Sequence, residues 1–233
     1  MRSRRAGGLW LLALALVTGS VARADGEEPQ ECARAIAARV QARYDGVEDI
    51  EARFSQRSRS VALGGAAQDF EASGVAIFAK PGRMRWTYEK PDPSLVVSDG
   101  QTLWIYDPAA REVQEFPVGE GFLSGTAVQF LLGEGRILEA FEVHAEQCTG
   151  ETVRLLLRPR QDATYELLEL LVAPETGDVR GTAVVDLFGN RTDVAFESLR
   201  LNRHPEPARF RFAAEPGVRV LRATQAPGGE APK

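Results

Sequence analysis

The sequence has little of what catalytic sites are usually made from. Its 233 residues include only two histidines and two cysteines, and neither an HExxH nor a CxxC pattern occurs, which excludes the common zinc sites. No GxxxxGK[ST] loop is present, and Ser124 lacks the glycine spacing of a GxSxG nucleophile elbow. The acidic residues fall where turns and solvent-facing positions are expected. We therefore predict that the protein is not an enzyme and has no catalytic residues, metal site or cofactor.

Long hydrophobic runs are also missing, with one short exception near the N-terminus. Residues 9–17 are apolar, follow three arginines and precede the small-x-small pattern Ala22-Arg23-Ala24, which is typical of a secretory signal. The run is too short to span a bilayer, which takes roughly 20 residues. We predict that residues 1–24 are a cleaved signal peptide. A lipoprotein signal would have its acylated cysteine where this chain has Ser20, so we expect a soluble product without a lipid anchor.

Positive charge is scarce in the remainder of the chain. The formal net charge is −5, and because residues 1–24 hold four arginines and no acid, their removal would lower it to −9. An acidic surface argues against nucleic-acid binding and against lying on an anionic membrane. Residues 25–222 suit a single domain. Residues 223–233 are rich in proline and glycine and are predicted to be a disordered tail.

The two cysteines both follow the predicted cleavage site. An even number of cysteines in an exported chain favours a disulfide between Cys32 and Cys148. Two separate buried thiols are the alternative.

The pattern of apolar residues predicts a mainly β protein with a few helices. A helix is expected over 31–44, where apolar residues recur every four positions, and a second over 126–132. From residue 50 the period changes to two, and Asp99-Gly100 predicts a hairpin with a type I′ turn. Residues 137–143 could form either a helix or a strand. Further strands are expected over 70–79, 84–88, 95–98, 102–106, 111–116, 153–157, 165–172, 179–187 and 194–201.

Several strands carry large apolar side chains on both faces. Trp104 and Tyr106 share one face of their strand, while Leu103 and Ile105 share the other. A strand that is apolar on both faces is buried on both. About ten strands in all, with two or three helices, favour a curved sheet or an unclosed antiparallel β-barrel, with helices covering its concave, hydrophobic side. The interior could be a solid core or a ligand cavity.

Several motifs resemble those of the periplasmic outer-membrane lipoprotein carriers, the LolA family, and they occur in the family's order over roughly residues 30 to 222. They are Ala52-Arg53-Phe54-Ser55-Gln56, the run from Met84 to Pro91, LVVSDGQTLWIYDP at 95–108, Phe188-Gly189-Asn190-Arg191-Thr192, the run from Pro207 to Phe212, and Pro216-Gly217-Val218.

The resemblance implies a half-barrel whose hydrophobic cavity takes the acyl chains of lipoproteins. It implies acylated lipoproteins as cargo, received from an inner-membrane ABC transporter and passed to an outer-membrane acceptor. On this basis we expect a monomeric periplasmic carrier. The residues expected to bind lipid are Phe54, Phe78, Met84, Trp86 and Val96 on the sheet, and Val128, Phe130 and Leu131 on the covering helix.

One position departs from the family pattern. Many relatives have an arginine before the proline matched by Pro81, where it is thought to hydrogen-bond the helical lid. This chain has Lys80, which lacks the planar fork of arginine, so a latch to the lid would be looser or absent.

Three alternatives to a carrier stay open at this point. The chain could be a non-lipidated relative of the outer-membrane acceptor, although Ser20 counts against an anchored acceptor. It could bind another amphiphile such as a glycolipid, or act as a sensor in a signalling pathway. It could also be a structural or interaction protein with a filled barrel.

Overall fold

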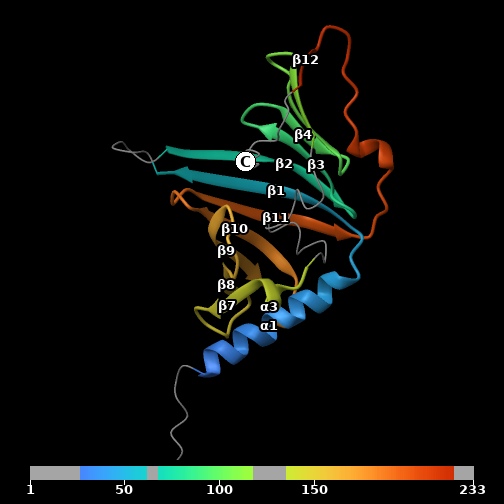
Figure 1. Ribbon diagram of the computed structural model, residues 1–233. Helices are drawn as coiled ribbons and strands as arrows, with labels where there is room; N and C mark the ends of the chain where they lie inside the picture. Colours follow the sequence, from blue (N-terminus) through green and yellow to red (C-terminus); the bar gives the residue numbers. More distant parts are fainter. Residues whose placement is uncertain (1–26, 62–67, 118–134, 223–233) are drawn as a thin grey trace, which may run out of the picture.

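The computed structural model describes residues 27–61, 68–117 and 135–222 (Figure 1). The helical elements are α1 (Glu27–Asp45), α3 (Ile137–Ala140) and the 3-10 turn η1 (Pro207–Phe210). The first strands are β1 (Asp49–Ser60), β2 (Gln68–Ala79), β3 (Arg83–Lys90), β4 (Ser94–Ser98), β5 (Thr102–Asp107) and β6 (Glu112–Pro117). The later strands are β7 (Phe141–Ala145), β8 (Val153–Pro159), β9 (Tyr165–Val172), β10 (Val179–Asp186), β11 (Arg191–Leu201) and β12 (Arg219–Arg222).

All twelve described strands belong to one sheet. Their order is β12-β6-β5-β4-β3-β2-β1-β11-β10-β9-β8-β7, so β12 and β7 form its two edges and the sheet does not close. Neighbouring strands are antiparallel except at one edge, where β12 runs parallel to β6. Helix α1 lies beside α3 and β7, toward the β7 edge of the sheet (Figure 1). The prediction of an unclosed, mainly antiparallel sheet is therefore confirmed.

Strand β1 shows how the sequence defines two faces of this sheet. Ile50, Ala52 and Phe54 are almost fully buried, and Ile50 and Phe54 belong to the main apolar cluster, which also contains residues of α1. Arg53, between Ala52 and Phe54, and Ser55, which follows Phe54, are exposed. We call the face that carries the main apolar cluster the inner face and the opposite one the outer face. The alternation follows from the two-residue period of a strand.

Helix α1 packs on the inner face because its apolar residues recur at helical spacing. The fully or nearly fully buried residues of this stripe are Ala33, Ile36, Ala37, Val40 and Tyr44. The hydroxyl oxygen of Tyr44 accepts a hydrogen bond from the backbone N–H of Val179 at 3.1 Å. At Gly177, with φ of +75°, an added Cβ would lie 2.7 Å from the carbonyl oxygen of Arg39, so the turn before β10 can approach the helix only with glycine there.

A disulfide joins Cys32 of α1 to Cys148, which follows β7. The two cysteines are 116 positions apart in the sequence. The bond thus ties the N-terminal half of the helix to the edge of the sheet that it contacts.

The outer face of the β2–β6 region is covered by the C-terminal segment. Phe210 is fully buried against Ile77 and Ala79, and the ring of Phe212 lies 5.0 Å from that of Tyr106 between centroids. This cover accounts for the strands that are apolar on both faces. The sequence pattern had predicted the burial but not the segment that provides it.

The Asp99-Gly100 turn differs from its prediction. The hairpin forms, with Ser98 opposite Leu103, but Gly100 has a positive φ of 93° and Asp99 does not, so the turn is not type I′. The Oδ1 atom of Asp99 instead accepts hydrogen bonds from the backbone N–H groups of Gln101 and Thr102, both at 2.9 Å. A side chain therefore closes this turn.

The remaining differences are at element boundaries. Residues 137–143, left open between helix and strand, contain both: α3 followed directly by β7. Helix α1 begins at Glu27, earlier than predicted, and β12 and η1 were not predicted. The predicted signal peptide, the helix over 126–132 and the tail over 223–233 lie outside the described residues.

Candidate functional site

The inner face carries a cluster of aromatic rings, which we call the aromatic wall: Phe54, Phe78, Trp86 and Tyr88. The ring of Phe54 meets Trp86 edge to face at 4.7 Å and Tyr88 at 5.2 Å, measured between centroids. Phe78 meets Trp86 in the same way at 5.3 Å. Edge-to-face contacts of this kind stabilise the cluster beyond simple burial.

Small residues of β2 make room for these rings. Ala72, Gly74 and Ala76 occupy successive inner positions of β2, with Gly74 opposite Phe54 and Ala76 opposite Trp86. An added Cβ at Gly74 would lie 1.9 Å from the carbonyl oxygen of Thr87 and 3.1 Å from the ring of Phe54. Any larger residue at this position would push β3 or the ring away, so Gly74 is needed for the wall to form.

The structure brings the five described residues of the predicted lipid site together. Phe54, Phe78 and Met84 are buried, while Trp86 and Val96 are partly exposed, and all five belong to or pack on the main apolar cluster. Val128, Phe130 and Leu131 lie outside the described residues. The grouping of the five residues on one face follows from strand register, in which Trp86 is opposite Val96 and Met84 is opposite Ser98.

Sequence reasoning missed part of this surface. Further partly exposed apolar residues pack on the same cluster, and among them are Tyr88, Ile105, Val184, Val194 and Phe196. Phe196 is the Cα partner of Phe54 across β1 and β11. The alternation in 194–201 had identified the strand, but only the pairing register shows that its apolar residues extend the aromatic wall.

Lys80, the predicted lid residue, lies at the end of α1. Its Nζ atom is 3.5 Å from the backbone carbonyl oxygen of Asp45, the last residue of that helix. A cation at a helix C-terminus is electrostatically favourable. Whether Lys80 also contacts a lid formed by the predicted helix over 126–132 stays a prediction.

The aromatic wall is uncharged. The inner positions of β1, β2 and β3 hold apolar or neutral polar side chains, and burial raises the pKa of the Tyr88 hydroxyl. Burial also raises the pKa of Tyr165, which joins the same apolar cluster, to about 12. Within the described ranges, no group of three or more histidine, cysteine or acidic residues could hold a metal ion. The surface is suited to apolar contact.

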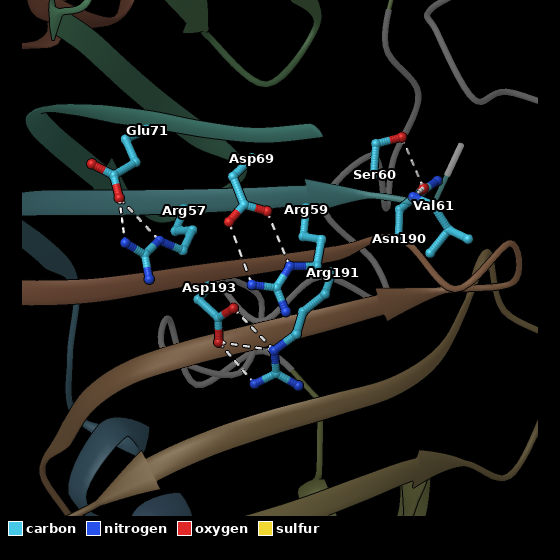
Figure 2. Close-up of polar contacts among 9 residues, drawn as sticks. All are labelled: Arg57, Arg59, Ser60, Val61, Asp69, Glu71, Asn190, Arg191 and Asp193. Carbon is cyan, nitrogen blue, oxygen red and sulfur yellow. Dashed lines mark hydrogen bonds and ion pairs between the residues drawn. The ribbon is translucent and has the colours of Figure 1, made fainter. Parts of the chain in front are cut away.

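The outer face has a different hollow, of about 910 Å³, over β1, β2 and β11. Figure 2 shows the charged side chains beside it, in which Arg57 pairs with Glu71, Arg59 with Asp69 and Arg191 with Asp193. Lys90 also lines this hollow and has no ion pair among the described residues, so the hollow is charged and polar and unsuited to apolar contact. We therefore place the candidate site on the inner face.

None of the helices in the described part of the chain is long and apolar enough to cross a membrane. An open, curved sheet with an uncharged aromatic inner face and a helix packed against it defines the class: a half-barrel with an apolar inner surface.

Comparison with known proteins identifies the family. Residues 45–213 match the family model described as outer membrane lipoprotein carrier protein LolA, and the chain belongs to that family. An outer-membrane lipoprotein carrier protein of Chromobacterium violaceum is 32% identical over 79% of this chain and 86% of its own length. Its namesake in Azotobacter vinelandii is 31% identical over 76% of this chain and 83% of its own length. The resemblance inferred from the sequence motifs is confirmed.

A solved structure shares the fold at low sequence identity. The crystal structure of an uncharacterized conserved protein from Thermus thermophilus covers 82% of this chain and 99% of its own, with a TM-score of 0.50 and 13% identity. At this identity the likeness concerns the fold alone.

Proposed function

We propose that this protein is a periplasmic carrier that holds the acyl chains of lipoproteins against its inner face. The observation that carries the proposal is the aromatic wall together with partly exposed apolar residues around it, which include Trp86, Val96 and Phe196. Its relatives are named outer-membrane lipoprotein carrier proteins, which supports lipoproteins as cargo. In this proposal residues 1–24 direct export, and Ser20 leaves the exported monomer without a lipid anchor.

The energetics favour partial burial of the cargo. Each buried CH₂ group contributes about 0.8 kcal/mol, so one 16-carbon chain could contribute on the order of 10 kcal/mol. Three fully buried chains would exceed the practical ceiling of about 20 kcal/mol for non-covalent binding, and such a complex would not release. An open sheet whose inner residues stay partly exposed suits a carrier that must unload.

The partners follow from the same reasoning. The sequence has no Walker-type nucleotide-binding loop, so in this proposal an inner-membrane ABC transporter drives loading. Unloading then needs an outer-membrane acceptor that binds the cargo more tightly. No role in catalysis is proposed.

The two tryptophans of the described chain allow a direct test. Trp86 is on the inner face, and Trp104 is on the outer face, opposite Val97 and Glu115. Two variants, each also carrying Trp10→Phe, would retain one of them: Trp104→Phe and Trp86→Phe. Each is titrated with a diacylated peptide whose acyl chains carry bromine, a short-range fluorescence quencher.

We expect bound brominated chains to quench Trp86 strongly and Trp104 weakly. A non-brominated peptide of the same length controls for changes in fluorescence caused by binding alone. If no acylated peptide binds either variant or the unmodified protein, the carrier function is wrong. Quenching of Trp104 but not Trp86 would place the site on the outer face instead.

A further inference from the structure

The inner face of β1 changes character partway along the strand. Ile50, Ala52 and Phe54 are 1%, 1% and 3% exposed. The next two inner positions, toward the β1–β2 hairpin, are Gln56 and Ser58, which are polar and partly exposed. Strand rise is about 3.3 Å per residue, so the change occurs within about 7 Å. The inner face therefore has a boundary between an apolar end and a polar end.

Four polar side chains beyond this boundary form a hydrogen-bonded row, which we call the polar strip: Tyr88, Gln56, Ser58 and Thr192. The Tyr88 hydroxyl donates to Oε1 of Gln56 at 3.3 Å, and Nε2 of Gln56 donates to Oγ of Ser58 at 3.0 Å. The hydroxyl oxygens of Ser58 and Thr192 are 3.2 Å apart. The strip thus extends from β3 to β11, across β2 and β1.

The polar strip has hydrogen-bond donors that no protein group in the strip uses. The amide of Gln56 has two N–H donors, and only one of them is used by Ser58. The Ser58 and Thr192 hydroxyls share one hydrogen bond, which leaves the proton of the other hydroxyl free. All of these residues are partly exposed. The strip can therefore donate two further hydrogen bonds to a ligand that accepts them.

Apolar groups border the strip on the inner face. Gln56 is opposite Val194, which packs on the main apolar cluster, and the Tyr88 and Phe54 rings adjoin the strip at the aromatic wall. Phe70, opposite Ser58, is 51% exposed. The end of the strand is held in place because Oδ1 of Asn190 accepts hydrogen bonds from Ser60 Oγ and from the backbone N–H of Val61 (Figure 2).

We propose that the polar strip binds a diacylated cysteine, in which ester groups link the acyl chains to glycerol. The strip donates hydrogen bonds to the carbonyl oxygens of these esters. Esters accept hydrogen bonds and donate none, which matches the spare donors of Gln56 and of the Ser58–Thr192 pair. The acyl chains then lie on the aromatic wall, and the polypeptide leaves toward the β1–β2 hairpin. This inference rests on the proposed carrier function and gives the cargo a direction on the inner face.

The test compares two probes with identical chains. One is a diacylated cysteinyl peptide with ester linkages, and the other is the same peptide with ether linkages, which lack the carbonyl acceptors. We expect the unmodified protein to prefer the ester probe. Gln56→Leu should lower its affinity for the ester probe about five- to tenfold and leave the ether probe within about twofold, because a neutral hydrogen bond contributes about that much.

Two further variants complete the design. Tyr88→Phe removes the hydroxyl that orients the Gln56 amide and should cost the ester probe about two- to threefold. Ser55→Leu is the matched control, since Ser55 is the neighbouring residue of β1 on the outer face, and it should change neither affinity. Circular dichroism confirms that each variant is folded.

The outcomes separate this inference from the proposed function. Equal binding of the two probes by the unmodified protein, or an equal loss of both in Gln56→Leu, would overturn the polar strip as a subsite while leaving the carrier intact. If neither probe binds the unmodified protein, the carrier function is wrong and this inference with it.

Discussion

The two faces of β1 belong to the same strand but carry different side chains, which are charged and paired on the outer face and mainly apolar on the inner face. On the outer face Arg53, Arg57 and Arg59 each pair with an acid of β2 or β3. On the inner face Phe54 and Phe78 are buried, whereas Trp86, Tyr88, Val96 and Phe196 stay partly exposed. The arginines of this strand are therefore paired within the molecule, whereas the inner face keeps partly exposed apolar side chains.

The pKa values of acidic groups at the two faces shift in opposite directions, because an arginine pairs with the one and apolar burial surrounds the other. On the outer face the arginine Arg191, which donates two hydrogen bonds to Glu169, holds the pKa of that carboxyl below its usual value. On the inner face apolar surroundings raise the pKa of Tyr165 to about 12. Charge is thus stabilised on one side of the sheet and excluded from the other, which is the environment that acyl chains require.

The largest predicted effect concerns the disulfide that ties α1 to the sheet. The Cys32→Ser/Cys148→Ser double variant should lose about 4–5 kcal/mol of the free energy of unfolding, because a bond across 116 positions strongly restricts the unfolded chain. Guanidinium unfolding measures the loss. Two free thiols in the unreduced, denatured protein would show that the protein does not contain the bond.

The second effect concerns a buried ion pair of the outer face. Glu169 is 5% exposed and lies 2.6 Å from Arg191 and 2.8 Å from Arg154. Glu169→Ala removes the partner that both arginines share and should cost about 1–2 kcal/mol of the free energy of unfolding, because the arginines are partly exposed and Arg191 keeps its pair with Asp193. The effect on lipid binding should be small, since the residue faces away from the aromatic wall.

Glu166→Ala is the control on the same strand. Its carboxylate pairs with Arg158 at 3.0 Å but is 59% exposed, so its removal should cost less than about 1 kcal/mol. Equal losses for Glu166→Ala and Glu169→Ala would mean that burial of the Glu169 pair contributes nothing.

These two faces were only partly predictable from the sequence. The period-two pattern around Phe54 was sufficient to separate inner from outer residues on β1. The polar strip was not predictable, because Ser58 and Thr192 are 134 positions apart and only the register of β1 with β11 brings them together. Strand β12 was not predicted because its four residues are all exposed, so no alternation of apolar residues indicates a strand there.

The third prediction uses neighbours on opposite faces of β4. Val96 packs on the inner cluster, whereas Leu95 is opposite Tyr106 on the outer face, and both are partly exposed. Val96→Glu should weaken binding of a diacylated peptide about tenfold or more, because a charge must then contact acyl chains or stay hydrated. Leu95→Glu should leave binding unchanged. Similar losses in the two variants would remove the distinction between the faces.

The fourth prediction is that the protein loses stability to unfolding at alkaline pH because of Tyr165. Because the pKa of Tyr165 is raised to about 12 in the folded protein and is about 10 when unfolded, the unfolded state releases this proton first. The contribution is fully present below pH 10 and is lost as the pH rises toward 12. Denaturant midpoints across this window should fall less in Tyr165→Phe than in the unmodified protein. Equal declines would show that Tyr165 is not the cause.

The smallest effect should come from the exposed ion pairs of the outer face. Arg57 is opposite Glu71 on one side and Asp193 on the other, so Arg57→Glu places like charges together and should lower the denaturant midpoint slightly at low salt. The swapped pair, Arg57→Glu with Glu71→Arg, should recover most of the loss, and about 1 M salt should remove the difference because it screens exposed charges. Both variants should bind diacylated peptide as the unmodified protein does. Weaker peptide binding in Arg57→Glu that the swap does not restore would mean that the outer face contacts the cargo. The charges of the outer face would then have a role beyond pairing with one another, and the conclusion that only the inner face binds the cargo would be wrong.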